Sequence, residues 1–113
     1  MTDQSYDIEV ERDEFGVTRR VWLTRASDGT LSLAGHDMGG AVSEFWGDDF
    51  DEYEWSWTLG PARVPALFEA FDVDAPPADA TLEMAVKLRA IGTQAAQTQF
   101  ENAGAEFWSR LGD

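Results

Sequence analysis

The chain of 113 residues is 43% hydrophobic and contains 14 aromatic residues (five Trp, two Tyr and seven Phe), which predicts a folded domain and excludes an acidic disordered segment. Its 22 acidic and 8 basic residues give a net charge of -14, which would repel nucleic acid phosphates and anionic membrane surfaces. The absence of cysteine excludes disulfides, thiolate metal sites and a cysteine nucleophile.

The first residues are polar, and no segment reaches the roughly 20 apolar residues that span a bilayer. We therefore expect a cytoplasmic protein that binds neither nucleic acid nor a membrane directly. Neither half of the chain has the composition of a separate domain or of a low-complexity tail. Residues 1–113 are predicted to form a single acidic domain.

Three strands are predicted in the first third of the chain. Residues 6–11 alternate strictly, residues 17–25 are rich in β-branched side chains, and residues 30–34 form the third strand. The alternation in the first strand separates three hydrophobic residues from three carboxylates: Tyr6, Ile8 and Val10 on one face, Asp7, Glu9 and Glu11 on the other.

The sequence Ser-Asp-Gly-Thr at residues 27–30 predicts a hairpin turn, because aspartate and glycine tolerate positive φ. A two-residue loop would place Trp22 on the same face as Leu31 and Leu33. A three-residue loop with a bulge would instead place Leu23 beside Leu33. The pattern is compatible with both registers.

The segment from Gly35 to Gly40 is too rich in glycine to predict a regular element, and the hydrophobic residues after it have helical spacing over residues 41–46. The clearest strand covers residues 51–59. Its hydrophobic face is predicted to contain Tyr53, Trp55, Trp57 and Leu59.

The second half of the chain predicts helices. One begins near Pro65, a second covers residues 79–91 after a proline-containing linker, and a third begins at Thr93. Gly104 indicates a helix end, and residues 105–111 then favour a last strand, although one helix continuing to Leu111 also fits the hydrophobic spacing. The predicted fold is α+β: an antiparallel or mixed sheet of four to five strands packed against the helices of the C-terminal half, in the order ββββ, helices, β.

The most unusual feature is an acidic and aromatic segment at residues 48–54, with five carboxylates and two aromatic rings. No lysine or arginine occurs between Arg25 and Arg63, so the neutralising charge must come from elsewhere in the fold or from a basic partner. Aromatic anchor residues surrounded by charged residues are typical of protein interfaces. The predicted partner-binding residues are Trp46, Asp48, Asp49, Phe50, Asp51, Glu52, Tyr53 and Glu54.

No catalytic residue set is identified. His36 is the single histidine, and Asp37 beside it could orient it as a general base, but neighbours in an extended chain point apart and no serine has the framing of a nucleophile. A zinc site needs three or four ligands, usually nitrogen or sulfur, and one histidine without cysteine does not supply them. The segment 48–54 also lacks the spacing and the glycine of a calcium loop. We therefore expect no metal and no cofactor.

Four segments resemble those of a bacterial family of small acidic proteins of uncharacterised function: residues 31–39 (LSLAGHDMG), 44–47 (EFWG), 52–55 (EYEW) and 107–110 (FWSR). The resemblance covers most of the chain after residue 17. Such proteins are also similar to small immunity proteins that neutralise a cognate toxin. The resemblance implies a strand through residues 107–110 and supplies no catalytic residues.

The predicted function is that of a non-enzymatic protein-binding domain, with an immunity or antitoxin-like inhibitor as its specific form and a basic protein, such as a toxin, as its partner. One alternative is a small-molecule-binding or enzymatic domain centred on the loop from Gly35 to Gly40, with His36 and Asp37. A second alternative is a self-associating structural module.

Overall fold

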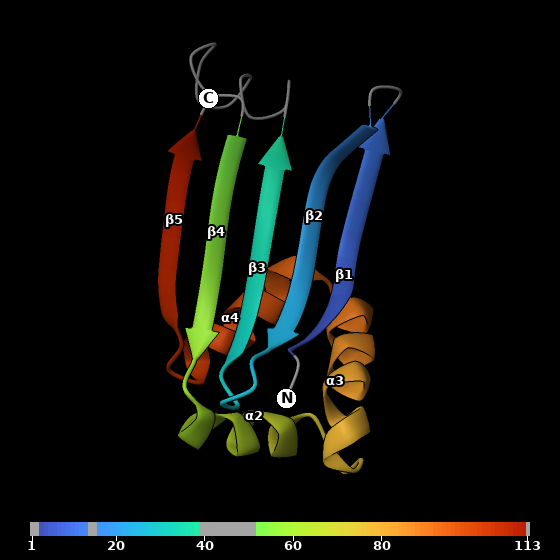
Figure 1. Ribbon diagram of the computed structural model, residues 1–113, viewed down its shortest axis with the longest axis vertical. Helices are drawn as coiled ribbons and strands as arrows, with labels where there is room; N and C mark the ends of the chain where they lie inside the picture. The colour runs from blue at the N-terminus through green and yellow to red at the C-terminus, as the bar shows by residue number, and fades with distance from the viewer. Residues whose placement is uncertain (1–2, 14–15, 39–51, 113) are drawn as a thin grey trace.

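The computed structural model describes residues 3–13, 16–38 and 52–112. It contains one sheet and a group of helices (Figure 1), whose bounds are β1 Gln4–Asp13, β2 Gly16–Arg25, β3 Leu31–Met38, β4 Glu52–Leu59, the 3₁₀ helix η1 Pro61–Arg63, α2 Val64–Ala70, α3 Pro77–Ile91, α4 Thr93–Asn102 and β5 Glu106–Gly112. The sheet has the spatial order β1-β2-β3-β4-β5, and every neighbouring pair is antiparallel. The predicted α+β class and the order ββββ, helices, β are confirmed.

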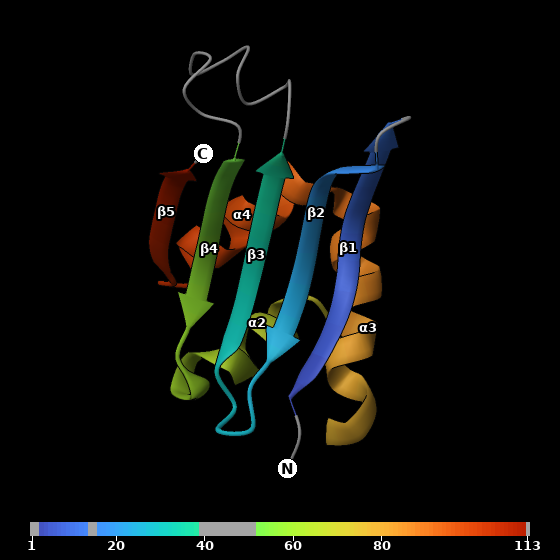
Figure 2. The ribbon, with the colours of Figure 1, turned by 45° about the horizontal axis from the view of Figure 1, so that its top comes forward.

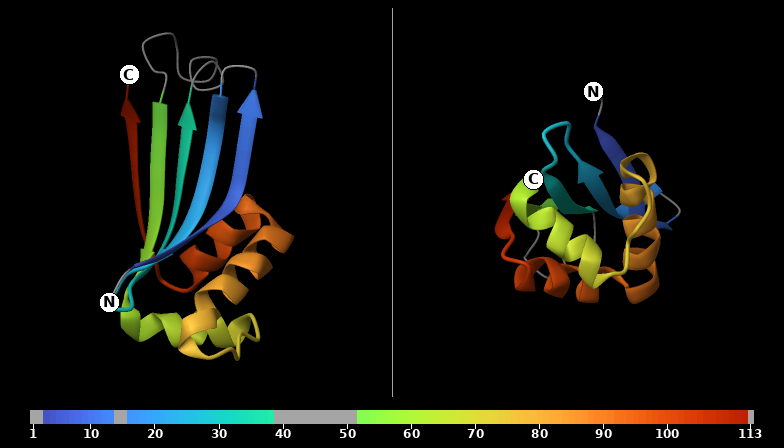
Figure 3. Two further views of the ribbon diagram at one scale, coloured as in Figure 1. Left: turned by 45° about the vertical axis from the view of Figure 1, so that its right-hand side comes forward. Right: turned by 90° about the horizontal axis from the view of Figure 1, so that it is seen from below.

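The molecule has two layers, because α3 and α4 pack on one side of the sheet while α2 lies across one of its ends (Figures 2 and 3). We call the covered side the helix face and the opposite side the open face. The core between the layers consists mainly of aliphatic side chains with a few aromatic ones, and its fully buried members include Val21, Leu23, Leu31, Leu33, Leu59, Val64, Met84, Leu88 and Phe100. None of the helices in residues 52–112 has the length and apolar character of a membrane span.

The β2–β3 hairpin has the register with the three-residue loop. The amide of Ala26 donates to the carbonyl of Thr30 at 2.9 Å, and Gly29 has φ +93°, a backbone conformation that favours glycine. Leu23 therefore lies opposite Leu33, and both side chains are buried in the core. The register predicted from a two-residue loop is wrong, since Trp22 pairs with Ala34 and points to the open face.

A bulge in β1 reverses the predicted faces of the residues that follow it, Glu9 to Glu11. The register with β2 shifts between Asp7 and Glu9, so two residues of β1 occupy the space of one. Ile8 is buried as predicted, but Glu9 follows it on the helix face, where it accepts a hydrogen bond from Thr93 Oγ1 at 3.1 Å. Val10 moves to the open face and is 37% exposed.

Strand β3 extends beyond its predicted end at Ala34, because Gly35 to Asp37 continue the pairing with both β2 and β4 and Met38 pairs with β4. Gly35 is buried and faces the ring of Trp55, which fills the space of a side chain at residue 35. The glycine is thus required by close packing inside the sheet, and it does not mark a loop. The predicted helix at residues 41–46 lies outside the described residues.

The second half of the chain agrees with the sequence prediction. Helix α4 ends before Gly104, whose φ of +91° reverses the chain into β5. Strand β5 then pairs with β4, so the alternative of one helix continuing to Leu111 is wrong. Because β4 and β5 are neighbours, the helical segment that connects them closes back on the same sheet edge (Figure 1).

Candidate functional site

The predicted acidic and aromatic segment is only partly described. Trp46, Asp48, Asp49, Phe50 and Asp51 lie outside the described residues. Its last three residues belong to β4, where alternation separates them. Glu52 and Glu54 point to the open face, whereas Tyr53 is half-buried against the core on the helix face. In the described part of the segment, carboxylates and the aromatic ring therefore do not share one surface.

His36 and Asp37 do not pair, as expected for neighbours in an extended chain. Both residues lie in β3, so their side chains point to opposite faces. Asp37 accepts a hydrogen bond from Arg19 Nε at 2.6 Å on the helix face. A catalytic histidine oriented by this aspartate, centred on a glycine loop, is therefore wrong on geometry: Gly35 to Met38 form strand, and residues 39–40 lie outside the described residues.

On the helix face, Arg19 neutralises the carboxylates of Asp37 and Glu9. The guanidinium also approaches Glu9, with 3.5 Å between Nη1 and Oε2. The hydrogen bond to Asp37 raises the pKa of Arg19 above its ordinary value, so the cation is retained. This arrangement pairs one arginine with two carboxylates beside the N-terminus of α4. We interpret it as a structural contact that links the sheet to the helices.

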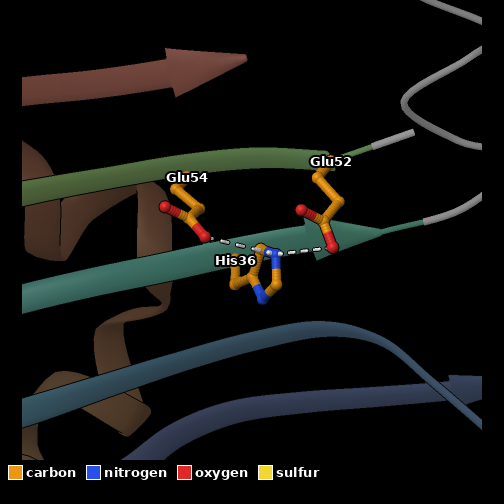
Figure 4. A group of neighbouring side chains, drawn as sticks. All are labelled: His36, Glu52 and Glu54. Carbon is orange, nitrogen blue, oxygen red and sulfur yellow. Dashed lines mark ion pairs between the residues drawn. The ribbon is translucent and has the colours of Figure 1, made fainter. Parts of the chain in front are cut away.

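On the open face, His36 is placed between two carboxylates of the neighbouring strand (Figure 4). The β3–β4 register sets His36 opposite Glu54 and Met38 opposite Glu52, so Glu52 is the diagonal neighbour of His36. His36 Nε2 lies 3.7 Å from Glu54 Oε1 and 3.9 Å from Glu52 Oε1. The three residues form a group that could hold a metal ion, since one donor atom from each lies within 4.8 Å of the others.

Beside this group, the open face has an aromatic groove with a volume of about 220 Å³. Its floor contains the small residues Ala34 and Ser56, and its sides include Trp22 and Trp108. Register places these four residues in one row across β2, β3, β4 and β5. The two indoles therefore stand on strands separated by two others, and the groove between them exists because the intervening side chains are small.

Charged residues border the groove and already pair across strands. Arg20 Nε lies 2.8 Å from Asp7 Oδ1, and the Arg20 guanidinium carbon lies 5.1 Å from the centroid of the Trp22 ring. Arg110 approaches the second oxygen of Glu54 at 3.5 Å. The open face thus combines indole rings with both signs of charge, a composition suited to recognition of polar and cationic groups.

Two parts of this surface were not identified from the sequence. The histidine and glutamate group depends on a cross-strand register that the intervening residues 39–51 do not reveal. The groove depends on β5 returning to β4, which brings Trp108 into the row of Trp22. The available signal was the alternation in residues 52–58, because it places Glu52, Glu54 and Ser56 on one face.

No protein-family model, curated protein or solved structure matches this chain. The functional interpretation therefore depends on the geometry and charge of the open face.

Proposed function

We propose that the chain is a non-enzymatic protein-binding domain that binds a basic protein through the open face of its sheet. The observation that carries the proposal is the groove between Trp22 and Trp108, which is bordered by Glu54 and is covered by no described element of the chain. Trp108 is 51% exposed, an unusual state for so large an apolar side chain in a small domain.

An arginine or lysine side chain of the partner is the chemical group that fits this groove. A guanidinium can stack on an indole, and such contacts contribute about 0.5–2 kcal/mol depending on how far they are desolvated. Arg20 shows this geometry within the chain itself, since its guanidinium already lies over the ring of Trp22. Glu54 and Glu52 then supply carboxylates for the partner's charge.

The overall charge supports the same partner class. A net charge of -14 attracts a basic protein over distances set by the Debye length of about 8–10 Å, which accelerates association at low salt. In its specific form, the proposal is an immunity or antitoxin-like inhibitor that covers the basic substrate cleft of a toxin. The resemblance of residues 31–39, 52–55 and 107–110 to the small acidic family motivates that form.

The proposal is tested by capture with matched variants. The wild-type chain, Trp108→Ala and the double variant Glu52→Gln/Glu54→Gln are immobilised and exposed to host extract at low salt, and proteins released by added salt are identified. Leu82→Ala and Glu101→Gln are the controls, because they remove an exposed apolar residue and an exposed carboxylate from the helical layer. The captured protein is then purified and its binding constants are measured with each variant.

The expected result is one basic protein that binds the wild type and both controls. Trp108→Ala should weaken the equilibrium affinity about tenfold or more, because truncation of an aromatic interface anchor costs about 2 kcal/mol. The double glutamate variant should mainly slow association and reduce its dependence on salt. Equal affinity for all five proteins would contradict binding through the open face.

A further inference from the structure

We propose that His36, Glu52 and Glu54 form a binding site for a divalent first-row transition metal of the zinc class. The site goes beyond the proposed protein-binding function: it shares Glu52 and Glu54 with that surface, but it needs no partner protein. Its three donors come from β3 and β4 alone, and Figure 4 shows both glutamate side chains directed toward the same edge of the imidazole.

The donor atoms already have nearly the spacing that a metal requires. Zinc lies about 2.0–2.2 Å from imidazole nitrogen and carboxylate oxygen, so donors at tetrahedral positions are about 3.3–3.5 Å apart. The observed separations from His36 Nε2 are 3.7 Å to Glu54 and 3.9 Å to Glu52. Small rotations of the two glutamate side chains, which move their oxygens by a few tenths of an ångström, would close this difference. The backbone of the strands would not need to move.

The imidazole nitrogen at the centre of the group lacks a hydrogen-bond partner among the described residues. His36 Nε2 is buried and has no hydrogen-bond partner in the described part of the chain, although two carboxylates lie just beyond hydrogen-bond distance. A buried polar atom without a partner destabilises the fold. A metal between the nitrogen and the carboxylate oxygens would satisfy all three groups at once.

The chemistry of the donors selects the class of ion. One imidazole with two carboxylates suits zinc and neighbouring first-row ions, whereas calcium and magnesium prefer sites made wholly of oxygen. Three protein ligands leave at least one position for water or another ligand. Arg110 contacts the second oxygen of Glu54 at 3.5 Å, which is the kind of outer contact that orients a metal-binding carboxylate.

The sequence alone predicts no metal site. One histidine without cysteine is too few soft donors for a zinc site, but the register adds two glutamates that are 16 and 18 residues away along the chain. The donors also sit on paired strands, which hold their backbones in fixed positions.

The test is titration of the tag-free, full-length chain with zinc chloride by isothermal calorimetry, together with NMR of the imidazole. Because His36 is the single histidine, its ring signals report the site without overlap. The variants are His36→Gln, and Glu52→Gln/Glu54→Gln as a second, independent removal of donors. The control is Glu83→Gln/Glu101→Gln, which removes the same number of carboxylates from α3 and α4.

The proposal predicts one saturable zinc equivalent, a shift of the His36 ring signals that saturates with it, and a higher thermal midpoint in zinc. Each site variant should weaken binding about tenfold or more, and the control should bind as the wild type does. Zinc binding that His36→Gln leaves unchanged, or a His36 signal that does not move at 1 mM zinc, would overturn the proposal. Calcium at the same concentration should leave the His36 ring signals in place.

Discussion

Gly35 lies directly opposite Trp55 in the β3–β4 pair, and the indole of Trp55 occupies the space that a side chain at residue 35 would need. Trp55 is almost completely buried, so a displacement of its ring would disturb the packing of the core around it. Gly35 also lies at the floor of the groove between Trp22 and Trp108. Packing on the helix face and the shape of the open face are thus coupled through one glycine.

Gly35→Ala should lower the free energy of unfolding by about 1–3 kcal/mol, the usual cost of forcing atoms into a packed interior. Gly60→Ala is the matched control, because a Cβ at Gly60 meets nothing within 4 Å and its φ of -63° suits alanine. That control should be neutral or stabilising by up to about 1 kcal/mol. Urea unfolding measures both, and equal stabilities would show that Trp55 has room to move.

Lys87→Met should destabilise the fold by about 1–2 kcal/mol, because the ammonium group donates to the carbonyls of Phe71 and Asp72 at the end of α2. The chain reverses direction at Asp72, which has an unfavourable positive φ of 56°. The hydrogen bonds from Lys87 help to stabilise this turn. Glu83→Gln removes only the exposed ion pair to Lys87 and should change stability by less than about 0.5 kcal/mol. Thermal or urea unfolding of the two variants separates these contributions, and equal losses would assign the effect to the ion pair.

The hairpin turn should give a measurable pH dependence. The backbone amide of Thr30 donates to Asp28 Oδ1 at 2.9 Å and holds the pKa of Asp28 below its ordinary value of 3.8. A lowered folded pKa adds stability above the unfolded pKa, and this stability is lost as pH falls through the folded value. Wild type should therefore exceed Asp28→Asn in stability above about pH 4, and the difference should shrink in more acidic solution.

An NMR titration of the Asp28 carboxyl carbon checks the cause directly. In Thr30→Ala the backbone amide is kept, so the pKa of Asp28 should stay below 3.8. An inflection at or above 3.8 in the wild type would contradict the role of this amide.

The elements that could be predicted from sequence are those whose hydrophobic period is uninterrupted. The alternation of residues 53–59 placed Trp55 and Leu59 in the core, and Gly104 correctly separated α4 from β5. Failures occurred where one residue broke the period. The bulge beside Ile8 reversed the faces of Glu9 and Val10, and no local pattern marks that extra residue.

The candidate site was less predictable because it is made by pairing between strands. His36 and Glu54 have no special spacing in the sequence, and they become neighbours only through the β3–β4 register. Gly35 appeared to end a strand, since glycine in sequence does not distinguish a loop from a position filled by a neighbouring ring. The contribution of the partner-binding residues from Trp46 to Asp51 stays a prediction, because they lie outside the described residues.

The claim that the open face is the binding surface is tested most directly by NMR of the tryptophan indoles during titration with an octa-arginine peptide at low salt. Trp22 and Trp108 lie on the open face, whereas the indole N–H of Trp57 donates to Gln97 on the helix face at 2.9 Å and serves as an internal control. We expect saturable shifts of the Trp22 and Trp108 signals, an unchanged Trp57 signal, and reversal by added salt. Shifts confined to Trp57 and the helical amides, with Trp22 and Trp108 unmoved, would contradict it.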